Sequence, residues 1–359
     1  MDFLKQLLIT KFKWPMFYPS KFKLDEEMKQ NLSRKKLVDH SKYIGIEIEV
    51  EQITRAFMQE LSEQLWFNTE DGSLRNNGRE FVTPPIRGKQ IIYSLDEFYR
   101  LLPDKADFSD RTSIHIHVNM RNATFEELFN VLMIYLVFEQ MLYRFAGNTR
   151  YKNIFCVPIQ ETKLPTSISN ILALENLNDI AEVWQKYSGL NLRPIASLGT
   201  VEYRHLRGNR DVDYILNWID IILSIHKTAS LISFNDLFKL IRTLNTTSAY
   251  IEFMEYVFPT QYKNFVSYDL KGLMEYGVSV VKSIALPSKF LHELINNMSN
   301  QSKLLKQLDI SKENKVNLTK EKLNIQSGSG PILQPNTMSF INDFEINYEG
   351  TTITNTGTW

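Results

Sequence analysis

The chain has 359 residues, 43% of them hydrophobic, and its 41 acidic residues balance its 41 basic residues. This size and composition fit a globular protein with one large domain or two. A formal net charge of zero excludes the bulk basic field that attracts nucleic acids or anionic membranes, so we expect neither as a partner. The single cysteine, Cys156, excludes an intramolecular disulfide, and no segment reaches the roughly 18 apolar residues of a membrane span. We therefore expect a soluble, cytoplasmic protein.

Composition divides the chain into three parts. Residues 1–42 form a lysine-rich N-terminal arm, in which prolines interrupt any helix and aromatic side chains are expected to pack on the domain surface. Residues 43–298 form the main domain, whose C-terminal part is helical in pattern. Residues 299–359 are rich in polar residues and include the linker-like Ser-Gly repeat at 327–330, which predicts a flexible tail.

The stretch 45–51 alternates apolar side chains with carboxylates, which is the period of a β-strand. Side chains two positions apart share a face, so Glu47, Glu49 and Glu51 line up. A row of carboxylates suits a bound Mg²⁺ or Mn²⁺, or it is simply the wet face of an edge strand. We assign no role to Glu51.

Further elements follow in order. A helix is predicted over 54–65, an Asp71-Gly72 turn joins two short strands, and a strand begins at Glu80 and is closed by two prolines. A helix is predicted over 91–102. Residues 112–119 form a second alternating strand with His115 and His117 on one face.

Two long apolar helices flank a third informative strand. The first, 124–145, begins with a capping box of Thr124 and Glu127, and a structural salt bridge is expected for Glu139. An insertion over 162–184 includes a helix near 175–184. In the strand 200–208, Glu202 and Arg204 share a face. The second helix, 214–234, is capped by Asp211 or Asp213, and later helical segments break at four positions: Pro259, Gly272, Gly277 and Pro287.

A sheet that gathers these polar faces on one concave side would hold ligands for divalent cations beside an arginine, which suits phosphoryl transfer. The sequence has no glycine-rich phosphate loop, so metals and arginines would have to hold ATP. Each motif also has another interpretation: the histidine pair occurs in zinc hydrolases and as a buried pair, and Arg204 could be a salt-bridge partner. A serine or cysteine nucleophile has little support.

Taken in order, the motifs resemble the carboxylate–amine ligase superfamily, which includes glutamine synthetase and glutamate–cysteine ligase. They are G-x-E-x-E, D-G-S followed by E-F-V-T-P, S-I-H-x-H-V-N, and T-V-E-Y-R. The resemblance is closest to the amidoligase branch of bacteria and their viruses. That branch also has an Arg and an Asn near a Cys-x-Pro, and a K-Y-x-x-L-N stretch, which are similar here to Arg150, Asn153, 156–158 and 186–191. The resemblance covers about residues 43–225.

The resemblance implies an α+β fold in which a curved, mainly antiparallel sheet cups the active site and helices pack on its outer face, as in the glutamine synthetase catalytic domain. It implies ATP and Mg²⁺ or Mn²⁺ as cofactors. The implied metal ligands are Glu47, Glu49, Glu80, His115 and Glu202. The implied catalytic residues are Asp71 for the amine, Arg204 for phosphate, and Arg150 for the substrate carboxylate or a phosphate.

The resemblance implies nucleotide or metal binding for His117 and nucleotide binding for Arg204. Glutamine synthetases carry an arginine two residues before the E-x-R glutamate, where this chain has Thr200. Arg207 or Arg210 is therefore the candidate to supply that charge.

The implied function is an ATP-dependent ligase that forms an amide or isopeptide bond through an acyl phosphate, from a carboxylate and an amine carried by small molecules or peptides. The alternative is a non-catalytic structural or interaction protein that kept this fold, for example in a virion, with its tail bound to a protein partner or neighbouring subunit. A third interpretation is a metal-dependent hydrolase, which would turn over without ATP.

Overall fold

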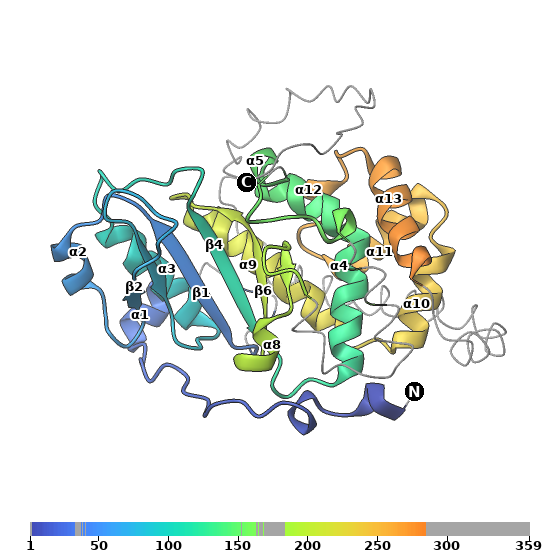
Figure 1. Cartoon of the computed structure of the whole chain (residues 1–359), viewed down its shortest axis with the longest axis horizontal. Helices are drawn as coiled ribbons and strands as arrows, with labels where there is room; N and C mark the ends of the chain where they lie inside the picture. The colour runs from blue at the N-terminus through green and yellow to red at the C-terminus, as the bar shows by residue number, and fades with distance from the viewer. Residues whose placement is uncertain are drawn as a thin grey trace, which may run out of the picture. The chain divides into compact units, whose positions relative to one another are not determined.

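The computed structural model describes residues 2–32, 37, 39, 41–151, 153–162, 164, 168 and 184–284 (Figure 1). These lie in one compact unit, Met1–Leu304. The predicted tail, the predicted helix at 175–184 and the break at Pro287 lie outside the described residues. The strands are β1 (Ile44–Val50), β2 (Phe67–Thr69), β3 (Arg79–Val82), β4 (Ser113–Asn119), β5 (Leu190–Asn191) and β6 (Thr200–Arg207).

The helices and 3-10 turns of the described residues alternate with these strands and then follow them. They are η1 (Asp2–Lys5), η2 (Leu8–Thr10), α1 (Glu26–Asn31), α2 (Arg55–Glu60), α3 (Lys89–Leu101), α4 (Phe125–Ala146), α5 (Asn148–Tyr151), η3 (Ile159–Glu161), α8 (Pro194–Ser197), α9 (Val212–Ala229), α10 (Phe234–Thr243), α11 (Thr247–Val257), α12 (Tyr262–Phe265) and α13 (Leu270–Ser283).

The described strands form one six-stranded sheet of order β2-β3-β1-β4-β6-β5, and every neighbouring pair is antiparallel. The strands that carry the predicted acids, histidines and arginine are therefore consecutive neighbours. Glu47 lies opposite His115, and Glu49 lies opposite Glu80. Cross-strand partners project from the same face, so one face of the sheet collects these polar side chains.

The opposite face of the sheet is the hydrophobic core, because the isoleucines that alternate with the polar positions of β1 and β4 are fully buried. Phe98 of α3 contacts Phe81 of β3, and Trp218 of α9 contacts His205 of β6. Figure 1 shows α3 and α9 on the far side of the strands. The prediction of an α+β fold with a mainly antiparallel sheet and helices on its outer face is confirmed.

A β-bulge interrupts β6. Ile114 and Ile116 are two residues apart on β4, but their respective partners, Leu206 and Tyr203, are three residues apart on β6. The extra residue places both partners on the helix-covered face. Arg207 then pairs with Ser113 and lies on the polar face. In a regular strand with Glu202 and Arg204 on that face, Arg207 would lie on the opposite face.

The start of α4 differs in part from the predicted capping box. Thr124 accepts a hydrogen bond from the backbone N–H of Glu127, as predicted, but the Glu127 carboxylate binds Lys42 Nζ at 2.8 Å. Among the described residues Glu139 has no salt-bridge partner, and its contacts are of another kind. Its carboxylate accepts hydrogen bonds from the backbone N–H groups of Ile159 and Gln160, at 2.7 and 3.1 Å, and so anchors that loop to α4.

The second predicted long helix, 214–234, ends earlier than predicted. α9 ends at Ala229, and Ser233 caps a new helix, α10, by accepting a hydrogen bond from the Asp236 N–H. Asp211 caps α9.

The glycines predicted to break the later helices lie inside α13. A Cβ at Gly277 would come within 2.2 Å of the carbonyl oxygen of Val137 in α4, so this glycine permits close helix packing. The predicted break at Pro259 is confirmed, since α11 ends at Val257.

The N-terminal arm lies against the domain. Trp14 Nε1 donates to the carbonyl of Ile195 at 2.6 Å, and Arg121 Nη1 donates to the carbonyl of Pro15 at 2.6 Å. The Arg121 guanidinium also lies over the rings of Trp14 and Phe17, as expected for arm aromatics that pack on the domain surface.

Helix α4, with 22 residues, is long and apolar enough to cross a membrane, and α9 with α10 meets the same criterion as a pair bent by 112°. This revises the prediction that no segment reaches such a length. In α4, 83% of the most apolar window is buried inside the protein. The buried Asn130 side chain also donates to the carbonyls of Ala229 and Ile232, which is the behaviour of a core helix.

Candidate active site

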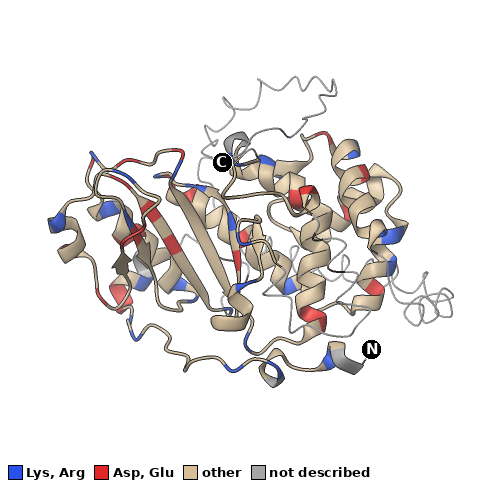
Figure 2. Cartoon of the chain, viewed as in Figure 1, with Lys and Arg blue, Asp and Glu red and all other residues tan. Residues whose placement is uncertain are grey.

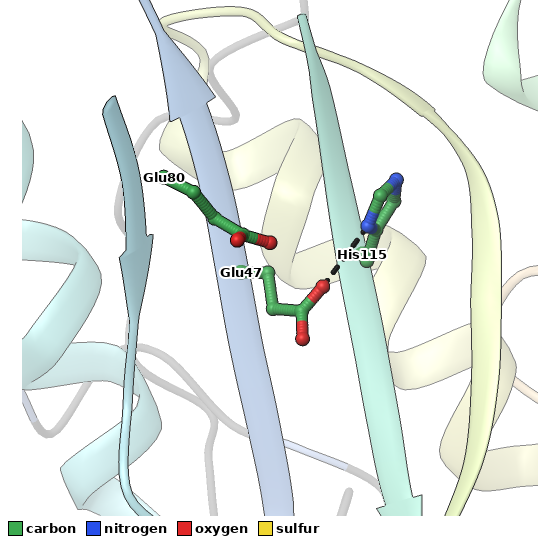
Figure 3. Close-up of side chains that lie close together, drawn as sticks. All are labelled: Glu47, Glu80 and His115. Carbon is green, nitrogen blue, oxygen red and sulfur yellow. Dashed lines mark hydrogen bonds and ion pairs between the residues drawn. The ribbon is translucent and has the colours of Figure 1, made fainter. Parts of the chain in front are cut away.

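The polar face of the sheet is centred on Glu47. Its Oε2 lies 3.0 Å from His115 Nδ1, and its Oε1 lies 3.0 Å from His117 Nε2. Figure 3 shows Glu47 between Glu80 of β3 and His115 of β4, with the Glu80 carboxylate directed toward it. One carboxylate therefore links both histidines, while Glu80 approaches from the other side.

Two groups of side chains could each hold a metal ion, and both include Glu47. The first is Glu47, Glu80 and His115, and the second is Glu47, His117 and Glu202; within each group the ligand atoms lie within 4.8 Å of one another. Each group offers two carboxylates, which are the oxygen ligands that Mg²⁺ and Mn²⁺ prefer, and one imidazole, which is a ligand more typical of Zn²⁺ and Fe²⁺. The residues thus fit the implied metal.

The excess of negative charge in the first group shows in Glu80. Burial and the charges of Glu47, Glu49 and Asp71 raise the pKa of Glu80 to about 8. A carboxyl with this pKa keeps its proton at neutral pH unless a cation takes the place of the proton, which is consistent with a cation site.

The second group is ionised. Burial alone would lower the pKa of His117, but the charges of Glu47 and Glu202 outweigh it and raise that pKa to about 9. Burial likewise would raise the pKa of Glu47, yet the two histidines hold it well below its ordinary value. The same balance, with Arg204 contributing, lowers the pKa of Glu202.

Strand β6 supplies an ion pair at the edge of this group, where Arg204 Nη1 binds Glu202 Oε1. His115 Nδ1 lies 3.3 Å from the same oxygen. Asn191 of β5 donates to Glu202 Oε2 at 2.6 Å. No role was predicted for Asn191, although it ends the K-Y-x-x-L-N stretch of the resemblance. Figure 2 shows acidic positions on the neighbouring strands and both signs of charge on β6.

Glu49 is not part of either group. Its Oε2 accepts hydrogen bonds from the backbone N–H and the hydroxyl of Ser113, at 2.8 and 2.6 Å. The Ser113 hydroxyl also lies 2.7 Å from His115 Nε2, so this serine connects Glu49 to a candidate ligand. Sequence reasoning missed Ser113, although the period of the strand places it on the same face as His115. Glu51 has a structural role, because its Oε1 accepts from the Arg75 N–H at 2.8 Å.

The two predicted catalytic residues away from the strands have different positions. Asp71 is half-buried, accepts a hydrogen bond from the Ser73 N–H at 2.7 Å, and is close enough for its charge to act on Glu80. Arg150 is buried, and its guanidinium donates to the carbonyls of His205 and Arg204, at 2.8 and 2.6 Å. The structure thus does not bring Arg150 into the polar face; Arg150 holds the backbone beside the β6 bulge.

The two arginines predicted to supply extra positive charge, Arg207 and Arg210, have different positions. Arg207 is exposed at the end of β6, on the face of Ser113. Arg210 is used structurally, because its Nη2 donates to the carbonyls of Pro103, Asp104 and Ala106. Thr200, which stands at the position of the glutamine synthetase arginine, places its hydroxyl 3.0 Å from His117 Nδ1 and so orients that ring.

An antiparallel sheet with helices on one face and a carboxylate–histidine–arginine cluster on the other defines an α+β protein whose site suits divalent cations and anions. The chain belongs to the family described as "Putative amidoligase enzyme", which matches residues 21–226, more than half of its length. The resemblance is thereby confirmed, and a ligase-type function is supported. No curated protein matches the chain.

A solved structure described as that of a novel glutamine synthase homolog is similar to this chain with a TM-score of 0.33 and 9% sequence identity. The similarity covers 79% of this chain and 73% of the other.

Proposed function

We propose that this protein is an ATP-dependent carboxylate–amine ligase that works with divalent metal ions and joins its substrates through an amide or isopeptide bond. Membership of the amidoligase family supports the reaction class. The observation that carries the proposal is that both candidate metal groups share Glu47 of β1. Arg204 lies on β6, two strands away in the same sheet.

Glu47, Glu80 and His115 would hold one metal ion, and Glu47, His117 and Glu202 would hold another. Bound Mg²⁺ or Mn²⁺ would neutralise phosphate oxygens of ATP. The protein orients these ligands itself: Ser113 and Thr200 fix the rings of His115 and His117, and Asn191 fixes the Glu202 carboxylate.

The proposed reaction has two steps. A substrate carboxylate oxygen attacks the γ-phosphorus of ATP, which gives an acyl phosphate and ADP; an amine then attacks the acyl carbon, and phosphate leaves as the C–N bond forms. Arg204, whose guanidinium Nε donates to the carbonyl of Phe155 at 3.3 Å, is positioned to balance phosphate charge. Asp71 accepts the proton that the amine loses. Arg207 adds positive charge at the end of β6.

The test is titration calorimetry of ATP, or a non-hydrolysable analogue, with and without Mg²⁺ or Mn²⁺, on wild type and Glu47→Gln. We expect metal-dependent nucleotide binding in the wild type and its loss in the variant, because the amide keeps the shape but not the charge that the cations need. Glu60→Gln, at an exposed position of α2, is the matched control and should bind like the wild type.

Wild-type binding would justify a screen of carboxylates and amines for ADP release. Absence of nucleotide binding under every metal condition would contradict the proposal and favour a non-catalytic structural protein. Metal-dependent hydrolysis of test substrates in the absence of ATP would favour the hydrolase interpretation instead.

A further inference from the structure

Two exposed aromatic side chains border the candidate site where β6 carries Arg204. Phe155 and Tyr187 are 36% and 37% exposed, and their ring centroids lie 5.4 Å apart at an interplanar angle of 84°. Ile154, the residue before Phe155, is 72% exposed. Single exposed apolar side chains are ordinary, whereas contiguous exposed apolar surface is typical of sites that bind ligands or partners. We call Phe155 and Tyr187 the aromatic platform.

The backbone beneath the aromatic platform is firmly held. The Val157 N–H donates to the carbonyl of Tyr187 at 2.6 Å, and the Gly189 N–H donates back to the carbonyl of Val157 at 2.9 Å. The Arg204 N–H then donates to the carbonyl of Gly189 at 2.8 Å, which joins both segments to β6. The two rings therefore stand on a fixed frame, although they lie in loops.

The charges around the aromatic platform are positive. The Arg204 guanidinium carbon lies 5.9 Å from the centroid of the Tyr187 ring, and Lys186 Nζ lies 5.4 Å from it. Arg204 Nε also donates to the carbonyl of Phe155. Exposed rings beside cations suit a ligand that combines a flat aromatic system with attached anionic groups.

The order of groups along the polar face matches one such ligand. Tyr187 lies beside Arg204, Arg204 binds Glu202, and Glu202 belongs to a candidate metal group with Glu47. A nucleoside triphosphate presents its base at one end and, beyond the ribose, phosphates whose oxygens contact cationic side chains and bind metal ions. Since the sequence has no glycine-rich phosphate loop, side chains must provide the contacts that hold such a ligand.

We propose that the base of the nucleotide co-substrate stacks on the Tyr187 ring of the aromatic platform and contacts the Phe155 ring at right angles, while Lys186 and Arg204 attract its phosphates. This inference rests on the proposed function and assigns the base-binding end of the same site.

Titration calorimetry separates base contacts from phosphate contacts if each variant is titrated both with Mg²⁺–ATP and with Mg²⁺–tripolyphosphate, which has no base. We expect Tyr187→Ala to weaken ATP binding by about tenfold or more, because one stacked base contributes that much, and to change tripolyphosphate binding by less than about twofold. Tyr187→Trp should retain ATP binding. Tyr18→Ala, at an exposed tyrosine of the N-terminal arm, is the matched control.

Three results would overturn the inference, and they differ from one another. If Tyr187→Ala weakened the binding of ATP and of tripolyphosphate equally, the ring would act through Arg204 and not through contact with a base. If Tyr187→Ala and Phe155→Ala both bound ATP like the wild type while Glu47→Gln did not bind it, the base-binding role of the aromatic platform would be wrong. The proposed function would then still be supported. No binding of ATP by the wild type would remove both.

Thermal unfolding midpoints of all variants show whether each variant is folded. Should Tyr187→Ala fail to fold, Phe155→Ala is titrated with both ligands in its place, with the same expected pattern.

Discussion

Glu47 is the residue on which the charge state of the whole cluster depends, because it contacts the imidazoles of both His115 and His117. In the metal-free protein the Glu47 carboxylate pairs with protonated His117. In the metal-bound protein the metal ion would take the place of that proton. Removal or addition of metal should therefore change how many protons the site binds.

The first prediction concerns His117 and pH. Its pKa in the metal-free fold is about 9, because Glu47 and Glu202 outweigh the effect of burial, and in the unfolded chain it is about 6.5. A raised pKa stabilises the fold fully below about pH 6.5, and that stability is lost as pH rises to about 9; the change is on the order of 3 kcal/mol. Urea unfolding in EDTA at a series of pH values should show this loss in wild type.

His117→Asn is the comparison for that experiment, and its stability should fall less steeply across the same window. Glu80 contributes equally to the pH profile of both proteins. Because its pKa is raised from 4.5 to about 8, the fold loses stability through Glu80 mainly between pH 4.5 and about pH 8. If the wild type and the variant had parallel pH profiles above pH 8, the assignment of the proton to His117 would be wrong.

The second prediction separates Arg150 from Arg204. Lysine cannot donate to two carbonyls in the way the buried Arg150 guanidinium does, so Arg150→Lys should lower the free energy of unfolding by about 2 kcal/mol. Arg204→Lys, at the polar face, should cost less stability but weaken ATP binding more. Chemical denaturation and calorimetry on both variants check this. A stable Arg150→Lys protein with poor ATP binding would return Arg150 to the substrate-binding role that the resemblance implies.

At the scale of secondary-structure elements, the packing of α13 on α4 depends on one position. Gly277 lies where a methyl group would meet backbone, the carbonyl oxygen of Val137 at 2.2 Å. Alanine is intrinsically better than glycine in a helix by roughly 1 kcal/mol, but here the helices would have to separate.

We therefore expect Gly277→Ala to lower the free energy of unfolding by about 2 kcal/mol in urea denaturation. Gly272→Ala in the same helix is the control. Its new methyl group would meet only the side chain of the capping Asp269. If that side chain turns away, the loss of its cap hydrogen bond costs about 1 kcal/mol, which the better helix propensity of alanine offsets, so the variant should be close to wild type in stability. Equal effects of the two substitutions would show that helix propensity, not the contact with α4, decides the result.

The sequence was sufficient to predict the strands of the site, because period-two alternation states which side chains share a face. The amino-acid pattern, together with the family resemblance, was enough to choose Glu47, Glu80, His115 and Glu202 as candidate metal ligands. His117, chosen for nucleotide or metal binding, lies in the second candidate metal group. Pairing across strands carries no such local signal. The separation of Glu49 from the candidate metal groups follows from its hydrogen bonds to Ser113, which no spacing rule predicts.

Other features depend on contacts between distant segments, and the sequence could not supply them. A glycine inside an apolar helix looks like a break until the backbone of another helix is known to approach it, as at Gly277. The role of Arg150 is hidden for the same reason, because its partners are carbonyl groups, which every residue has. The bulge in β6 is likewise defined only by the register with β4.

At the scale of the whole molecule, the N-terminal arm connects parts of the domain that are distant in sequence. Leu4 and Leu8 are buried, the Leu8 N–H donates to the carbonyl of Ala123, and Trp14 reaches Ile195. Trp14 also fills the space beside Gly199, the residue that leads into β6.

Trp14→Ala should therefore lower the free energy of unfolding by about 2 to 3 kcal/mol, because it removes a hydrogen bond, a cation–π contact with Arg121 and apolar packing. Met16→Ala, two residues away and 74% exposed, should change it by less than about 0.5 kcal/mol. Thermal and urea denaturation compare the two variants. An unaffected Trp14→Ala protein would show that the arm does not contribute to the stability of the domain.

The contact between Trp14 and Ile195 joins residues 181 positions apart. A ribosome that adds about 5 to 20 residues each second needs roughly 9 to 36 seconds to make the chain between them. The arm leaves the ribosome before the domain, yet the surface that receives Trp14 is completed only after β5 has been made. For that interval the Trp14 side chain lacks its final partner and faces solvent or a chaperone, so a segment made before the domain is among the last to reach its final place.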